Sequence, residues 1–341
     1  MTTLRRVPLS VLDLSPVSSG STASDALHST VALAQHVEAL GFTRFWLAEH
    51  HNNPGIASSS PAVLIAAVAA ATERIRVGSG GVMLPNHPSL VVAEQFGTLE
   101  GLFPGRIDLG IGRAPGTDQM TARALRRSVG PLSADDFPEQ LTDLIGFFAG
   151  GLSAGHPYGA MVAVPTAGAG PAMWLLGSSG YSAQVAGVLG LPFAFAHHFS
   201  PRNTMPALDL YRQSFQPSDV LAAPHAMVAV RVLVADDDAQ AQWLARSAYL
   251  SFLHLIQGRP GPVPTPEEAA NHPWTEEELM AVDERRDGEA VGGPAEVRDQ
   301  LAALLEATGA DELMATTVVH DPQVRLESYT RLAELFTEAA R

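Results

Sequence analysis

The chain has 341 residues, of which 46% are hydrophobic and 17% are charged, so it can bury a large core and lacks the composition of a disordered protein. Its formal net charge of −15 argues against nucleic acid or an anionic membrane as a partner, and no apolar run is long enough to cross a bilayer. It contains no cysteine, and all 21 basic residues are arginine, which excludes disulfides, thiolate metal sites, cysteine nucleophiles and Schiff-base chemistry. We expect a cytoplasmic protein that acts on small molecules.

Short apolar runs and stretches with helical periodicity alternate along the whole chain. The apolar run after Arg6 is broken by Asp13 and Pro16, which predicts a buried first strand and not a signal peptide. In chain order the predicted strands are 6–12, 43–48, 75–84, 105–112, 172–177, 191–196, 225–234 and 312–319. The predicted helices are 24–40, 61–71, 88–101, 136–149, 180–189, 203–215, 237–256, 294–308 and 322–340.

This alternation predicts an α/β protein with a closed parallel (β/α)8 TIM barrel, because strands buried on both faces are continuously apolar. We expect residues 1–341 to form a single domain, with insertions at about 113–135 after strand 4 and at about 258–292 after helix 7. The alternative, an open doubly wound sheet, would be favoured by a Gly-x-Gly-x-x-Gly run after the first strand, and the sequence has none. Because such barrels carry their active sites at the carboxyl ends of the strands, candidate residues are sought there.

The second predicted strand ends at Glu49, His50 and His51. Side chains alternate along an extended segment, so the two histidines point to opposite sides and at most one faces the centre of the barrel. One histidine would act as an acid, a base or a hydrogen-bond donor, with Glu49 nearby. The alternative is a pair of partly exposed loop histidines with no role in chemistry.

The third and fourth predicted strands end in features that suit a bound ligand. Gly80 and Gly81 lie in a glycine-rich stretch, which allows a close approach of the backbone to a ligand but is also found at barrel corners. The segment after the fourth strand carries a cluster of guanidinium groups suited to phosphate, although ion pairs on a solvated helix are the alternative. These residues are Arg113, Arg123, Arg126 and Arg127.

The fifth predicted strand is followed by Ser178, Ser179 and Ser182 at the start of a helix. Hydroxyl groups and free backbone N–H groups at a helix N-terminus can bind an anion, whereas ordinary capping needs only one serine. With the glycines and arginines on neighbouring strands, these serines predict a pocket for a phosphorylated ring cofactor.

Three stretches make the sequence resemble the luciferase-like monooxygenases, a flavin-dependent family, over most of its length. They are GFTRFWLAEHHN, RVGSGGVMLPNHPSLVVAEQFGTLEGLFPGRIDLGIGRAPGTD and WLLGSSGYSAQVAGVLGLPFAFAHH. The resemblance implies that reduced FMN and O2 are used to oxygenate an organic substrate, which is an aliphatic aldehyde in bacterial luciferase.

The resemblance also implies roles for individual residues. It places the catalytic histidine at His50 with Glu49 beside the flavin, and a non-prolyl cis peptide under the flavin ring at Gly80-Gly81. It places the phosphate ligands at Arg113, Arg123, Ser179 and Ser182. Ser178 stands where the family has an acidic residue.

These features predict an FMN-dependent monooxygenase for a small organic substrate. Because the chain has no nicotinamide-binding fingerprint, reduced flavin would come from a separate reductase, and the resemblance implies a homodimer. An F420-dependent oxidoreductase and a non-catalytic flavin-binding protein are the alternatives within the superfamily. A metal-dependent barrel hydrolase is disfavoured, because strand 1 has no histidine and the chain has no lysine to carboxylate, so we expect no metal site. Substrate specificity is expected to lie in the two insertions.

Overall fold

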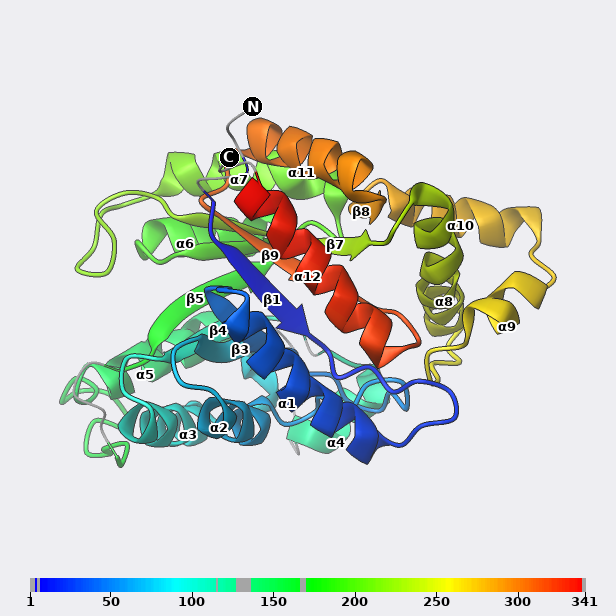
Figure 1. Cartoon of the computed structure of the whole chain (residues 1–341). Coiled ribbons are helices and arrows are strands. Elements are labelled where there is room, and N and C mark those ends of the chain that lie inside the picture. Colours follow the sequence, from blue (N-terminus) through cyan, green and yellow to red (C-terminus); the bar gives the residue numbers. More distant parts are fainter. Residues whose placement is uncertain (1–3, 5–6, 115, 127–135, 166–169, 339–341) are drawn as a thin grey trace.

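The computed structural model describes residue 4 and residues 7–114, 116–126, 136–165 and 170–338. Its strands form a single parallel sheet in which β6 also pairs with β7, so that eight of them close into a barrel (Figure 1). Around the ring these strands are β1 (Leu9–Asp13), β2 (Arg44–Leu47), β3 (Arg76–Met83), β4 (Ile107–Gly112), β5 (Ala172–Gly177), β6 (Phe193–Ala196), β7 (Ala226–Val234) and β9 (Glu312–Thr316). The predicted TIM barrel is therefore confirmed.

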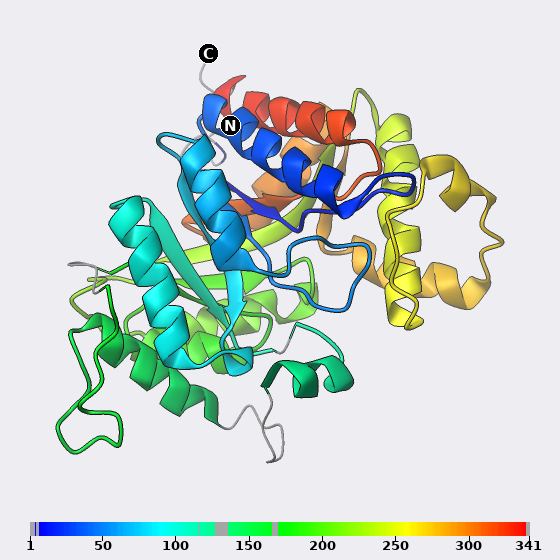
Figure 2. The ribbon, with the colours of Figure 1, turned by 90° about the horizontal axis from the view of Figure 1, so that it is seen from below.

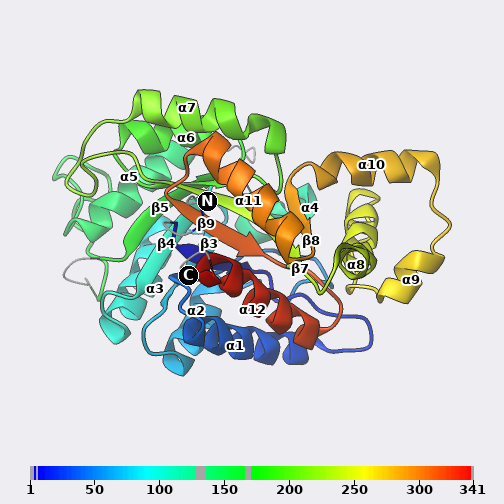
Figure 3. The same ribbon diagram turned by 45° about the horizontal axis from the view of Figure 1, so that its top comes forward.

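Helices surround the barrel on its outer face, as Figure 3 shows most clearly. They are α1 (Ala23–Ala39), α2 (Pro61–Ala71), α3 (Ser89–Leu102), α5 (Phe137–Phe148), α6 (Gly180–Val188), α7 (Thr204–Ser214), α11 (Pro294–Thr308) and α12 (Pro322–Glu338). Each lies within a few residues of its predicted range. Among the described residues, no helix is long and apolar enough to span a membrane.

The chain adds structure at the carboxyl end of the barrel that the sequence analysis treated as insertions. The first insertion contains helix α4 (Gln119–Arg126). The second forms α9 (Pro266–Asn271) and α10 (Glu276–Arg286), which lie beside α8 (Asp238–Ile256) on the side toward which the arrowhead of β1 points (Figures 1 and 2). These helices therefore stand where a barrel of this kind holds its ligands.

A ninth strand, β8 (Glu289–Gly292), was not predicted. It pairs in parallel with the last four residues of β7, Arg231–Val234, beyond the part of β7 that pairs with β6. This pairing fixes the end of the second insertion against the rim of the barrel.

A charged network fills the amino-terminal end of the barrel interior. Asp108 of β4 is fully buried and accepts hydrogen bonds from Arg44 at 2.9 Å, Arg76 at 2.6 Å and the Trp46 indole at 3.0 Å. Trp46 packs edge-on against Trp174, with ring centroids 5.4 Å apart. The two indoles pack inside the barrel next to this network.

Candidate active site

Two adjoining cavities lie at the carboxyl end of the barrel. The first cavity has a volume of about 210 Å³ and is bordered by the ends of β3 to β6 and the start of α6. The second cavity has a volume of about 350 Å³ and extends toward α8 and α10. Both are lined by Leu12, Gly80, Met83, Ala114, His198 and Phe199. Because they share these residues, the two cavities are direct neighbours.

Glu49 is a buried carboxylate held by four hydrogen bonds. Its oxygens accept from His87 at 2.8 Å, His51 at 2.9 Å, the Met83 backbone N–H at 3.0 Å and the Asn86 amide at 3.3 Å. Burial acts to raise the pKa of Glu49, but these hydrogen bonds outweigh it and lower the pKa to about 2. Glu49 lines neither cavity. It therefore ties the loop after β2 to the segment after β3.

His50 and His51 point to different sides, as the alternation predicted. His51 contacts Glu49, whereas His50 lines the second cavity. The Nδ1 atom of His50 is buried and has no hydrogen-bond partner among the described residues. Burial lowers the pKa of His50 below the 6.5 of an ordinary histidine, so the ring is neutral at neutral pH. A neutral imidazole with an unpaired nitrogen can donate or accept a proton on a ligand in the cavity.

The Gly80–Gly81 peptide bond is cis, and both residues line the first cavity. The pairing between β3 and β4 shifts register between Gly80 and Val82, so the glycines also form a bulge. A Cβ atom on Gly81 would lie 2.8 Å from the backbone oxygen of Gly110, which is too close for any larger residue. The two glycines therefore form a bulge, as one interpretation predicted, and they also form part of a cavity wall, as the other predicted.

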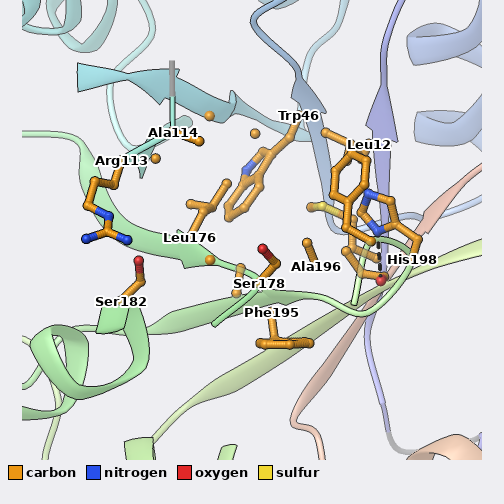
Figure 4. Close-up of a pocket in the computed structure, with 18 of the residues that line it drawn as sticks. Leu12, Trp46, Arg113, Ala114, Leu176, Ser178, Ser182, Phe195, Ala196 and His198 are labelled. Carbon is orange, nitrogen blue, oxygen red and sulfur yellow. Dashed lines mark hydrogen bonds between the residues drawn. The ribbon is translucent and has the colours of Figure 1, made fainter. Parts of the chain in front are cut away.

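The opposite end of the first cavity collects groups that bind anions. The guanidinium of Arg113 points toward Ser182 (Figure 4) and lies 4.2 Å above the ring of Tyr181. Ser179 occupies the N-cap of α6, and its hydroxyl makes no capping hydrogen bond, so it is available to a ligand together with the first N–H groups of the helix. Ser178 lies beside them in the lining. A guanidinium, hydroxyls and free backbone N–H groups are the donor set that a phosphate monoester requires.

The structure does not bring Arg123 of the predicted cluster to this place. Arg123 is exposed on α4 and does not line either cavity. Arg126 is the last residue of α4, but its side chain and Arg127 lie outside the described residues. Of the four arginines, Arg113 is thus the one that the described structure places in the cavity.

His198 of the Ala196-His197-His198 run lines both cavities, although the sequence analysis gave it no role. Its Nδ1 donates to the Ala229 carbonyl at 3.0 Å (Figure 4), and complete burial lowers its pKa to about 3. The ring is therefore a neutral hydrogen-bond acceptor at Nε2. The sequence showed that His198 follows a predicted strand, but the adjacent His197 does so too, and the sequence could not tell which of the two lines a cavity.

Comparison with known proteins gives a consistent result. A family profile described as luciferase-like monooxygenase matches residues 7–312. A luciferase-like monooxygenase of Escherichia coli K12 is 45% identical over 325 residues, which cover 95% of this chain and 96% of the relative. The crystal structure of apo-MsnO8 is 40% identical, covers 97% of this chain and 98% of its own, and superposes with a TM-score of 0.88.

The same fold occurs in more distant structures solved with two kinds of flavin. The oxygenating constituent of 3,6-diketocamphane monooxygenase from Pseudomonas putida, in complex with FMN, is 19% identical over 98% of both chains, with a TM-score of 0.74. An F420-dependent secondary alcohol dehydrogenase in complex with an F420–acetone adduct is 13% identical, covers 97% of this chain and 99% of its own, and has a TM-score of 0.68.

Proposed function

Because this chain belongs to the luciferase-like monooxygenase family, we propose that it is an FMN-dependent monooxygenase that oxygenates a small organic substrate with reduced flavin and O2. The observation that carries the proposal is the junction of the two cavities. A proposed phosphate-binding end at Arg113 and the Gly80–Gly81 wall adjoin a second cavity, which His50 lines and in which its Nδ1 has no partner among the described residues.

The residues present fit FMN. Arg113, Ser179, Ser182 and the first N–H groups of α6 would hold its phosphate, and the Gly80–Gly81 wall would support its ring. When bound and reduced, the flavin supplies the electrons that activate O2 for transfer to the substrate. His50 holds or moves a proton at Nδ1, because its lowered pKa keeps it neutral. The largely apolar lining of the second cavity limits the access of water, which favours oxygenation over loss of peroxide.

The proposal includes a separate reductase and a homodimer. The sequence contains no nicotinamide fingerprint, which supports an external source of reduced flavin. The barrel helices α2 and α3 expose Val63 at 72%, Leu102 at 64% and Val91 at 39%, which supports these helices as the dimer face.

An F420-dependent oxidoreductase is the second candidate, because a protein with this fold binds an F420 adduct. The phosphate ligands do not separate the two cofactors, since both carry a phosphate. The remaining candidate is a non-catalytic flavin-binding protein, and the unpaired His50 in a substrate-sized cavity argues against it.

Oxygen consumption and labelling separate these functions. The full-length protein is mixed with photoreduced FMN, ¹⁸O2 and a panel of small organic compounds, and the products are analysed by mass spectrometry. A monooxygenase places a single ¹⁸O atom in one compound of the panel. Failure to incorporate label into any compound, combined with substrate-dependent reduction of F420 in a parallel assay, would contradict the proposal in favour of the second candidate.

A further inference from the structure

The wall of the second cavity carries positive charge that the proposed flavin chemistry does not use. Arg231 of β7 and Arg285 of α10 both line this cavity, and their side chains are 6% and 15% exposed. None of the residues described in the lining is acidic. In a chain with a net charge of −15, two buried guanidinium groups on one cavity wall require a reason.

One carboxylate compensates part of this charge. Glu289 of β8 is paired in register with Arg231, forms an ion pair with it, and lies 3.6 Å from Nε of Arg285. Glu289 lies behind the cavity wall and also accepts a hydrogen bond from Tyr249 at 3.2 Å. Because His50 and His198 in the same lining have lowered pKa values and are neutral, two cations and one anion leave a net positive charge among the described side chains.

Polar atoms around this charge also lack hydrogen bonds. They are buried and lie on four different elements that converge on the cavity, yet none has a hydrogen-bond partner among the described residues. They are Nε of Arg231, Nε of Arg285, Oγ of Ser251 and Oγ1 of Thr316. Buried donors left without partners are unfavourable, and a bound acceptor would satisfy them.

The remainder of the cavity is apolar and leads back to the first cavity. Phe252 lies beneath the guanidinium of Arg285, at 4.1 Å from the ring centroid, which fixes the direction of that side chain. Leu14, Leu255 and Val318 belong to the same lining as His50 and Gly80. The cavity therefore combines cationic groups, an apolar surface and the residues of the proposed reaction site.

We propose that the substrate is an organic monoanion, a carboxylate on an apolar chain. Its head is bound by Arg231, Arg285, Ser251 and Thr316, and it is oxidised at the end remote from the carboxylate. This inference rests on the proposed function only for the last step, since the binding of the anion requires no flavin. The second insertion would then take part in substrate binding, because Arg285 and Glu289 both belong to it.

The test uses two probes of equal length, octanoate and octanamide, titrated by calorimetry into the full-length protein without flavin. The wild-type protein is expected to bind octanoate at least about tenfold more tightly than octanamide. Arg285→Met should remove this preference and leave octanamide binding unchanged. Arg286→Met is the matched control, because this neighbour on α10 is exposed and does not line the cavity, so the preference should remain.

The inference is overturned if the wild-type protein binds neither probe or binds both equally, or if Arg285→Met keeps the preference. Its failure is distinguishable from failure of the proposed function. A protein that prefers octanoate but incorporates no label from ¹⁸O2 contradicts only the monooxygenase. A protein that oxygenates neutral compounds and shows no preference for octanoate contradicts only the anion site.

Discussion

At the scale of single residues, the two histidines in the loop after β2 have different surroundings. His51 belongs to the hydrogen-bond set of the buried carboxylate Glu49, and His50 faces the second cavity with an unpaired nitrogen. Alternation along the sequence predicted this division but could not say which histidine faced the cavity. The resemblance assigned His50, and the geometry supports that assignment.

Replacing His50 is expected to slow turnover without releasing the cofactor. His50→Ala should lower kcat by about 10²-fold, because it removes a group positioned for proton transfer, while the affinity for FMN changes little. Since burial lowers the pKa of His50, the acidic limb of the wild-type pH–rate profile should lie below pH 6.5. His51→Ala should lower kcat far less. Steady-state oxygen consumption measures the rates and the pH profile, a fluorescence titration measures FMN affinity, and equal rates for wild type and His50→Ala would exclude this role.

Glu49 is expected to stabilise the fold in a way that depends on pH. Its pKa in the folded protein is about 2, against 4.5 for an ordinary glutamate, so the stabilisation is complete above pH 4.5 and is lost as the pH falls toward 2. Glu49→Gln should therefore lower the free energy of unfolding by about 2 kcal/mol at neutral pH. The difference from wild type should shrink in acid. Urea denaturation at several pH values tests this, and a difference that is independent of pH would contradict it.

The sequence predicted the residue types of the site better than their positions. Arg113 and the serines were found because phosphate chemistry limits which side chains can serve. The resemblance also assigned Arg123 to the phosphate, but this residue is exposed on α4, a helix within an insertion whose direction no sequence pattern specifies. Arg231 was missed because a lone arginine in an apolar strand carries no motif.

At the scale of elements, the start of α6 and the loop after β4 form the end of the first cavity that we propose binds the phosphate. Arg113→Met should weaken FMN binding by about 10–100-fold through loss of a charge-assisted hydrogen bond. Riboflavin, which lacks the phosphate, should bind the variant and the wild type equally.

The matched control for this variant is Arg123→Met, which removes an arginine from the exposed face of α4. It should leave FMN affinity unchanged. Fluorescence titration of both variants with FMN and riboflavin decides the matter, and a larger loss for Arg123→Met would restore the sequence-based assignment.

Strand and helix boundaries of the barrel were predicted because buried parallel strands and amphipathic helices each have a distinct period. The second insertion was harder, since its helices are short and β8 has only four residues. Helices α9 and α10 nevertheless begin with capping boxes, Thr265 with Glu268 and Thr275 with Glu278, and this pattern is visible in the sequence. Strand β8 forms only because β7 extends beyond its neighbours and offers an unpaired edge.

At the scale of the whole molecule, the buried charged network and the two cavities lie at opposite ends of the barrel. The charged network around Asp108 and the two indoles fill the amino-terminal end, while both cavities lie at the carboxyl end. The two insertions pack at that end, so substrate recognition can vary without altering the barrel. The extent of the single domain, residues 1–341, stays a prediction.

We propose above all that this barrel binds reduced FMN between Arg113 and His50. The most direct measurement is an anaerobic titration of the full-length protein with reduced FMN and, in parallel, with reduced F420, followed by fluorescence or absorbance. We expect saturable binding of one reduced FMN per chain in the micromolar range, with weaker binding of oxidised FMN and of F420. The absence of FMN binding in either redox state, or tighter binding of F420, would contradict it.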